Sequence, residues 1–152
     1  MDTDTTATTT PIHLWIVGGL ALLWNAFGCY DYFMTRTQGA TYIKTMMPSV
    51  DGAAFMAYVN AFPIWASIGW GLGVWGGLAG SILLLLRHRL AVPALLASFV
   101  GAVLGIGYQL ARPSGIPHMD EGANGAMGYI IIAVALGLFV YARAMRIKAV
   151  LR

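Results

Sequence analysis

The chain has 152 residues, of which 59% are hydrophobic and only 10% are charged, and its formal net charge is +3. A soluble domain carries about 25% charged residues, so most of this chain cannot face water. Its one cysteine, Cys29, excludes an intramolecular disulfide framework and a cysteine-based metal cage. The basic residues are scattered, so the positive charge is not that of a nucleic-acid-binding protein. The composition predicts an integral membrane protein whose first partner is the lipid bilayer.

The chain begins with a polar, threonine-rich stretch, residues 1–11, which predicts a disordered tail. Four apolar segments follow, each near the length of about 20 residues that a helix needs to cross the hydrocarbon core. They are 12–33, 62–86, 90–110 and 125–142. Backbone groups in lipid must bond within their own segment, which makes α-helices the expected form. We therefore expect an all-α, four-helix membrane bundle over 12–146, with a basic tail at 147–152.

A short amphipathic helix is expected between the first two spans, at the outer interface. It covers residues 48–62, and Ser49 or Asp51 is its expected cap. Asn60 and Asn124 are the expected caps of the second and fourth spans.

The distribution of lysine and arginine predicts the orientation. With four spans, both termini lie on the same side as the loop "RHR" at 87–89. The residues on that side are Arg87, Arg89, Arg143, Arg146, Lys148 and Arg152, against Arg36, Lys44 and Arg112 on the other. Basic residues are enriched on the cytoplasmic side of membrane proteins, so both termini are expected to be cytoplasmic.

Small residues recur at every fourth position in the second and third spans. The two rows are Gly69, Gly73, Gly77 and Ser81 in one span, and Ala97, Gly101 and Gly105 in the other. Such rows let helix backbones approach closely in lipid. They predict tight packing of these two spans within the chain; the alternative is that one row binds another subunit.

The segment "LWNAFGCYDYF", residues 23–33, places polar groups in an apolar span. Asn25 should face the bundle and bond a carbonyl or hydroxyl of a neighbouring helix, because an amide exposed to lipid is costly. Asp31 lies near the outer surface. Arg112 lies at the same surface and is a possible partner for Asp31, Asp120 or Glu121. The alternative interpretation is an outward-facing pocket for a small polar ligand. Its candidate ligand- or pore-lining residues are Trp24, Asn25, Asp31, Tyr32, Trp70, Gln109 and Arg112.

The sequence offers no enzymatic motif. It contains no phosphate-binding loop, dinucleotide fingerprint or zinc motif, and one histidine in "HMDE" (118–121) is poor evidence for a metal. No span carries an ionisable residue near its middle, which argues against an ion-coupled exporter. The expectation is a non-enzymatic protein without a metal or cofactor.

Two stretches resemble a family of small four-span bacterial inner-membrane proteins. They are "LWNAFGCYDYFMTRT" and "FPIWASIGWGLGVWGGLAGSILLLLRHRLAVP", and the pattern W-N-x-x-G-x-x-D-Y is the most specific part. The resemblance covers roughly the first two thirds of the chain. It implies a four-span fold in the bacterial inner membrane. Members are often labelled "sugar transporter"; by that label, Trp24, Asn25, Asp31, Tyr32 and Trp70 would line the path.

Two functions remain open at this point. The small size, the glycine rows and the lack of buried charge favour a homo-oligomer or an accessory subunit of a larger membrane assembly. The deep Trp/Asn set and the family label favour a facilitator for a small neutral solute. A sensor that uses the outer polar cluster is a third, weaker possibility.

Overall fold

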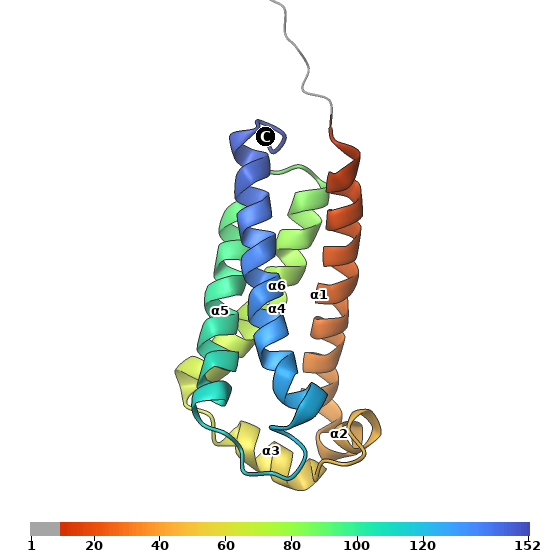
Figure 1. The fold of residues 1–152 in the computed structure, drawn as a ribbon, viewed down its shortest axis with the longest axis vertical. Helices are drawn as coiled ribbons and strands as arrows, with labels where there is room; N and C mark the ends of the chain where they lie inside the picture. Colours follow the sequence, from red (N-terminus) through yellow and green to blue (C-terminus); the bar gives the residue numbers. More distant parts are fainter. Residues whose placement is uncertain (1–9) are drawn as a thin grey trace, which may run out of the picture.

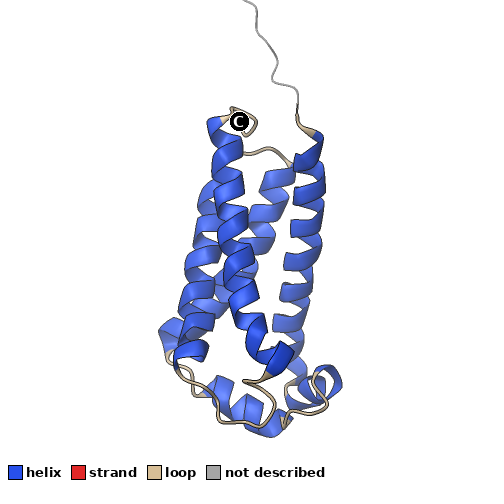
Figure 2. Cartoon of the chain, in the orientation of Figure 1, coloured by secondary structure: helices blue, strands red, loops and turns tan. Residues whose placement is uncertain are grey.

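The computed structural model describes residues 10–152, so residues 1–9 of the expected disordered tail lie outside the described part of the chain. The described chain is an all-α bundle of four long helices, with two short helices across one end (Figures 1 and 2). The long helices are α1 (Ile12–Gln38), α4 (Ile64–Leu85), α5 (Ala91–Ala111) and α6 (Gly122–Ile147); the short helices are α2 (Ala40–Met46) and α3 (Gly52–Asn60). The predicted four-helix fold is confirmed.

The bundle has two different ends. The start of α1, the α4–α5 connection and the C-terminus lie at one end, which we call the terminal end (Figure 1). Helices α2 and α3 and the α5–α6 loop cover the other, which we call the lid end (Figure 1).

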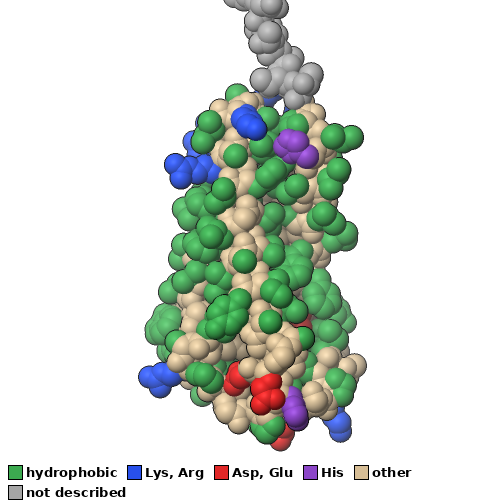
Figure 3. All heavy atoms as spheres, in the orientation of Figure 1, with side chains coloured by type: hydrophobic (Ala, Val, Ile, Leu, Met, Phe, Trp, Pro, Cys, Tyr) green, Lys and Arg blue, Asp and Glu red, His purple; other side chains and the backbone are tan. Residues whose placement is uncertain are grey.

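All four long helices are long and apolar enough to cross a membrane. On the face drawn in Figure 3, hydrophobic side chains form a band between the two ends, and charged side chains gather at the ends. Helix α1 has 27 residues, which at about 1.5 Å per residue is about 40 Å, more than the hydrocarbon core of about 30 Å. The chain has the architecture of a multi-pass membrane protein, and α1 continues past the core.

The expected cap of the short helix is confirmed, and Asp51 is the residue that provides it. Its carboxylate accepts hydrogen bonds from the backbone N–H groups of Ala53 and Ala54, at 2.9 and 3.1 Å. The caps expected at Asn60 and Asn124 are wrong. Asn60 is the last residue of α3, and α4 begins only after Pro63. Helix α6 starts two residues before Asn124, whose amide donates to the His118 carbonyl at 2.9 Å instead.

Helices α4 and α5 pack backbone against backbone through the predicted glycines. A Cβ added to Gly105 would lie 2.8 Å from the backbone nitrogen of Trp70, and one on Gly73 would lie 3.0 Å from that of Ala102. A Cβ on Gly101 would collide with the backbone nitrogen of Gly73. Only glycine permits this approach, so tight packing of these two spans is confirmed.

In the row of small residues on α4, the two members nearest the terminal end, Gly77 and Ser81, pack differently from the prediction. Gly77 lies against both Asn25 of α1 and Ser98 of α5, and Ser81 bonds to Asn25, whereas Gly76 faces the backbone of Ser98. The cause is geometric: a step of four residues turns about 40° further around a helix, so a row at this spacing winds to another face. On α5, Ala97 is only half-buried, and its neighbour Ser98 is the buried residue whose hydroxyl donates to the Gly73 carbonyl at 2.6 Å.

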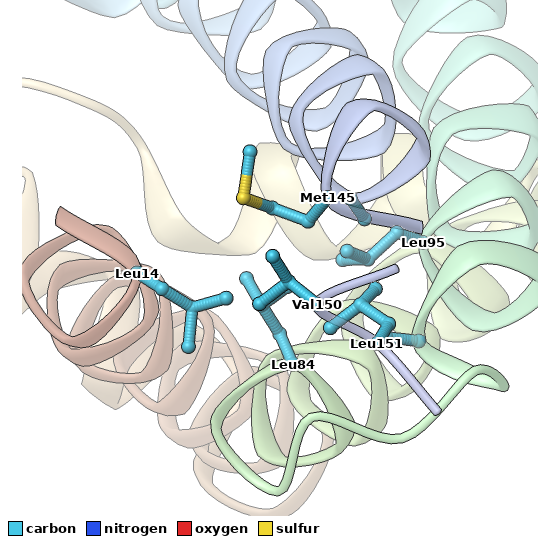
Figure 4. Close-up of a cluster of buried hydrophobic side chains, with 8 residues drawn as sticks. Leu14, Leu84, Leu95, Met145, Val150 and Leu151 are labelled. Atoms are coloured by element: carbon cyan, nitrogen blue, oxygen red, sulfur yellow. The ribbon is translucent and has the colours of Figure 1, made fainter. Parts of the chain in front are cut away.

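An apolar cluster seals the terminal end. Leu14 of α1 and Leu84 of α4 are 0% exposed, and their side chains point toward those of Leu95, Met145, Val150 and Leu151 (Figure 4). The chain after α6 thus turns back, and Val150 and Leu151 are buried in the bundle. The backbone of Arg152 exchanges hydrogen bonds with Arg87 and Arg89, at 2.8 Å each.

A second apolar cluster holds the lid together. Its buried members are Tyr42 and Ile43 of α2, Val50, and Met119 from the α5–α6 loop. Helix α2 itself was not expected from the sequence. It separates from α1 at Gly39, whose positive φ of 54° turns the chain sharply.

The four long helices form an incomplete ring. The closely packed pairs are α1 with α4, α4 with α5 and α5 with α6, and α1 with α6 is not among them. At the terminal end α1 and α6 do meet, where the His13 Nδ1 atom lies 2.5 Å from the Tyr141 hydroxyl. The two helices are therefore joined near the termini and loosely associated elsewhere.

The α4–α5 contact yields a direct test. Gly101→Ala should lower the free energy of unfolding by about 1–3 kcal/mol, because the added methyl overpacks a backbone contact. Gly137→Ala on α6 is the control, since nothing lies within 4 Å of its added Cβ. That variant should be neutral or slightly stabilising, because alanine favours a helix more than glycine. Thermal unfolding in detergent measures both, and equal effects would contradict this packing.

Candidate functional site

A cavity of about 560 Å³ lies between the four long helices and the lid. Its size falls within the range of small-molecule sites, about 300–1,000 Å³. All four long helices contribute to its wall, and Phe55, Phe62 and Met119 close it at the lid end. Most of the wall is apolar, and its polar groups come from α1, from α5 and from the α5–α6 loop and the start of α6. This cavity is the candidate site.

Asn25, a polar residue of the wall, is held by its neighbours. Its Nδ2 donates to the Ser81 hydroxyl of α4 at 3.0 Å and to the Ala21 carbonyl of its own helix at 2.9 Å. Ser81 in turn donates to the Gly77 carbonyl at 2.8 Å. Any larger residue at 77 would collide with the Asn25 amide. The expected bond to a neighbouring helix is confirmed, and both amide hydrogens are used by the protein.

Asp31 lines the cavity nearer the lid end. It is half-buried, and the Tyr42 hydroxyl of α2 donates to its carboxylate at 2.9 Å. Tyr42 is only 4% exposed. Burial, and secondly its bond to Asp31, raise the pKa of the Tyr42 phenol well above its usual value. The phenol therefore stays neutral at ordinary pH and adds no charge to the site.

The structure brings five of the seven predicted ligand- or pore-lining residues to this cavity. Trp24, Asn25 and Asp31 of α1, Trp70 of α4 and Gln109 of α5 all contribute to its wall. Tyr32 is not part of the wall. It packs edge-on against Trp70 with 4.8 Å between ring centroids, and the Arg36 guanidinium lies 5.1 Å from the Trp70 ring.

Arg112 does not join the site. Its side chain is exposed, and its carbonyl accepts a hydrogen bond from the Tyr58 hydroxyl at 2.6 Å. Asp120, one of its expected partners, accepts instead from the backbone and hydroxyl of Ser114, at 2.8 Å each. Within residues 10–152, the one contact between a basic and an acidic side chain joins His118 and Glu121, 3.7 Å apart on the surface. The pairing expected for Arg112 is therefore wrong, because the loop after α5 bonds to itself.

Several wall residues were not singled out in the sequence. Ser98 reaches the cavity from α5, and four methionines line its lid end: Met46, Met47, Met119 and Met127. Methionine is flexible and polarisable and suits adaptable binding surfaces. Their grouping in space depends on α2 and the α5–α6 loop, which no periodic pattern in the sequence reveals.

The cavity is closed at the terminal end and open on one side. The apolar cluster around Leu14 and Leu84 lies between it and the terminal end. Its wall includes Phe27 of α1 and Tyr129 of α6, which are 55% and 65% exposed. These two helices are the pair that does not pack closely. The cavity therefore opens between α1 and α6, at the height of the membrane-spanning segments, and its wall also reaches the surface at the lid end, where Pro113, Asp120 and Asn124 are exposed.

The described residues offer no metal site, since residues 10–152 contain no group of three His, Cys, Asp or Glu side chains suited to one. Cys29 lies outside the cavity wall, and its thiol donates to the Val74 carbonyl at 3.6 Å.

Comparison with known proteins gives no further constraint: no family model, curated protein or solved structure matches the chain.

The Asn25–Ser81 bond is testable by a double-mutant cycle. Asn25→Ala and Ser81→Ala should each lower the free energy of unfolding, and the pair should show a coupling of about 0.6–2 kcal/mol. Thermal or denaturant unfolding in detergent measures all four proteins. Strictly additive effects would show that the two side chains do not stabilise each other.

Proposed function

We propose that this chain is a non-enzymatic, multi-pass membrane protein that binds a small lipid-soluble ligand in the cavity between its four spans. The observation that carries the proposal is the shape of the cavity. It opens between α1 and α6 and is closed by the cluster at the terminal end. A ligand dissolved in the bilayer reaches such an opening directly.

The proposed location is the bacterial inner membrane, with both termini in the cytoplasm. Lysine and arginine counts support the orientation, with six such residues at the terminal end and three at the other. The family resemblance supports the choice of membrane.

A facilitator for a neutral solute such as a sugar is less well supported. Such a protein needs a polar path through the membrane. Here Leu14 and Leu84, both 0% exposed, occupy the terminal end, and the Asn25 amide hydrogens are already bonded. Passage would require the terminal cluster to open.

Action as an oligomer or as an accessory subunit remains a second proposal, and α6 is the observation that favours it. Over its 26 residues, only Ala142 and Met145 are buried within the chain. A Cβ added to Gly137 of α6 would have no neighbouring side chain or helix within 4 Å, so the surface of α6 is open there. A helix from another subunit could pack there in place of lipid.

The binding proposal is tested with the neutral dye Nile red and the full chain in lipid nanodiscs. We expect saturable binding to one site and at least a tenfold loss of affinity in Ala135→Trp, which places an indole in the cavity wall. Ala133→Trp is the matched control, because Ala133 is an exposed α6 residue outside that wall. Equal binding by the two variants would refute the cavity as the binding site.

A further inference from the structure

The charges of the cavity wall are all of one sign. Among the described residues that line it are two carboxylates, Asp31 and Asp120, and no lysine, arginine or histidine. Asp120 is exposed, and Ser114 donates two hydrogen bonds to it. Asp31 is half-buried and receives one hydrogen bond, from the neutral Tyr42 hydroxyl. Of the two carboxylates, Asp31 therefore has fewer hydrogen bonds to stabilise its negative charge.

The basic residues in the lid-end half of the protein do not neutralise Asp31. The Arg36 guanidinium lies over the rings of Tyr32 and Trp70, 5.6 and 5.1 Å from their centroids. Lys44 and Arg112 are exposed. None of the three forms an ion pair with Asp31 in the described part of the chain. A partly buried carboxylate without a counter-charge is costly, and a cation beside it removes that cost.

The rest of the wall suits the apolar part of a cation. Trp24 and Phe27 contribute aromatic rings, whose faces attract positive charge as well as apolar surface. Toward the terminal end, Leu95 and Leu138 make the wall aliphatic. The cavity therefore offers an anionic, aromatic region and an aliphatic region within one volume of about 560 Å³.

We infer that the cavity takes a lipophilic organic cation, with its positive charge beside Asp31 and its apolar body along the walls of α5 and α6. This inference rests on the proposed function and names its ligand class. An anionic amphiphile of the same shape is disfavoured, since two carboxylates and no basic side chain face it. A neutral ligand gains the apolar contacts but leaves Asp31 without a counter-charge.

The experiment compares two ions of the same shape and opposite charge. Tetraphenylphosphonium and tetraphenylborate are titrated into the full chain in nanodiscs of zwitterionic lipid. Binding to nanodiscs without protein is subtracted for each ion, because the dipole potential of the bilayer favours the anion in lipid. We expect saturable binding of the phosphonium at least tenfold tighter than that of the borate. Equal or tighter binding of the borate would overturn the cation inference. This comparison uses the unmodified protein and does not depend on the folding of any variant.

Asp31→Asn then tests the named residue. It keeps an oxygen for the Tyr42 hydroxyl and removes the charge, so it should weaken phosphonium binding at least tenfold and change Nile red binding by less than twofold. Asp51→Asn is the matched control: it removes a carboxylate at the α3 cap, outside the cavity, and should change neither. Unchanged phosphonium binding by Asp31→Asn overturns the inference. In that case Nile red binding that is sensitive to Ala135→Trp would still support the proposed function.

Discussion

Direct contact between the backbones of α4 and α5 is the interaction on which this bundle depends. In lipid there is no hydrophobic drive between helices, so close van der Waals packing must hold them together. Gly73, Gly101 and Gly105 provide it, and the Ser98 hydroxyl adds a hydrogen bond to the opposite backbone. Because these two helices are so close, little space remains between them for a ligand. The cavity lies beside this pair of helices, where α1 packs against α4 and α6 packs against α5.

The incomplete ring follows from how the two outer helices are attached. Helix α1 is held to α4 by Asn25 and Cys29, which bond to Ser81 and to the Val74 carbonyl. Helix α6 has few buried residues of its own and is anchored at the terminal end by Met145 and Ala142. The same end is sealed by the C-terminal residues. The bundle is thus tight near the termini and hollow toward the lid, which gives the cavity one closed end and one open side.

Much of the fold could be predicted from the sequence, because lipid imposes strong rules on length, hydropathy and helix contacts. The four spans, the glycine contact between α4 and α5, and the inward direction of Asn25 all follow from such rules. The helix partner of Gly77 and Ser81 did not follow, because a row of four-residue spacing winds around the helix. The surroundings of Arg112 did not follow either, since they depend on how the α5–α6 loop bonds to itself.

The candidate site was partly predictable for the same reasons. Polar or aromatic residues in an apolar span are visible in the sequence, and five of the seven residues chosen on that basis line the cavity. The methionines of the lid, Ser98 and the α6 wall carry no such signal. The bond between Tyr42 and Asp31 joins α2 to α1 across the sharp turn at Gly39. Because the sequence did not predict α2, it could not predict Tyr42 as the partner of Asp31.

Binding of a ligand from the bilayer requires a cavity that opens to lipid and is closed toward the terminal end. A nitroxide spin label at Val134→Cys, on the α6 wall of the cavity, tests it most directly in a Cys29→Ser background. Its collision rates with oxygen, which dissolves in lipid, and with a water-soluble nickel chelate are measured in liposomes. The structure predicts frequent collisions with oxygen and few with the nickel chelate. Frequent collisions with the chelate would reveal an aqueous path, and few collisions with either would show that α1 and α6 close over the cavity; each result would contradict the account.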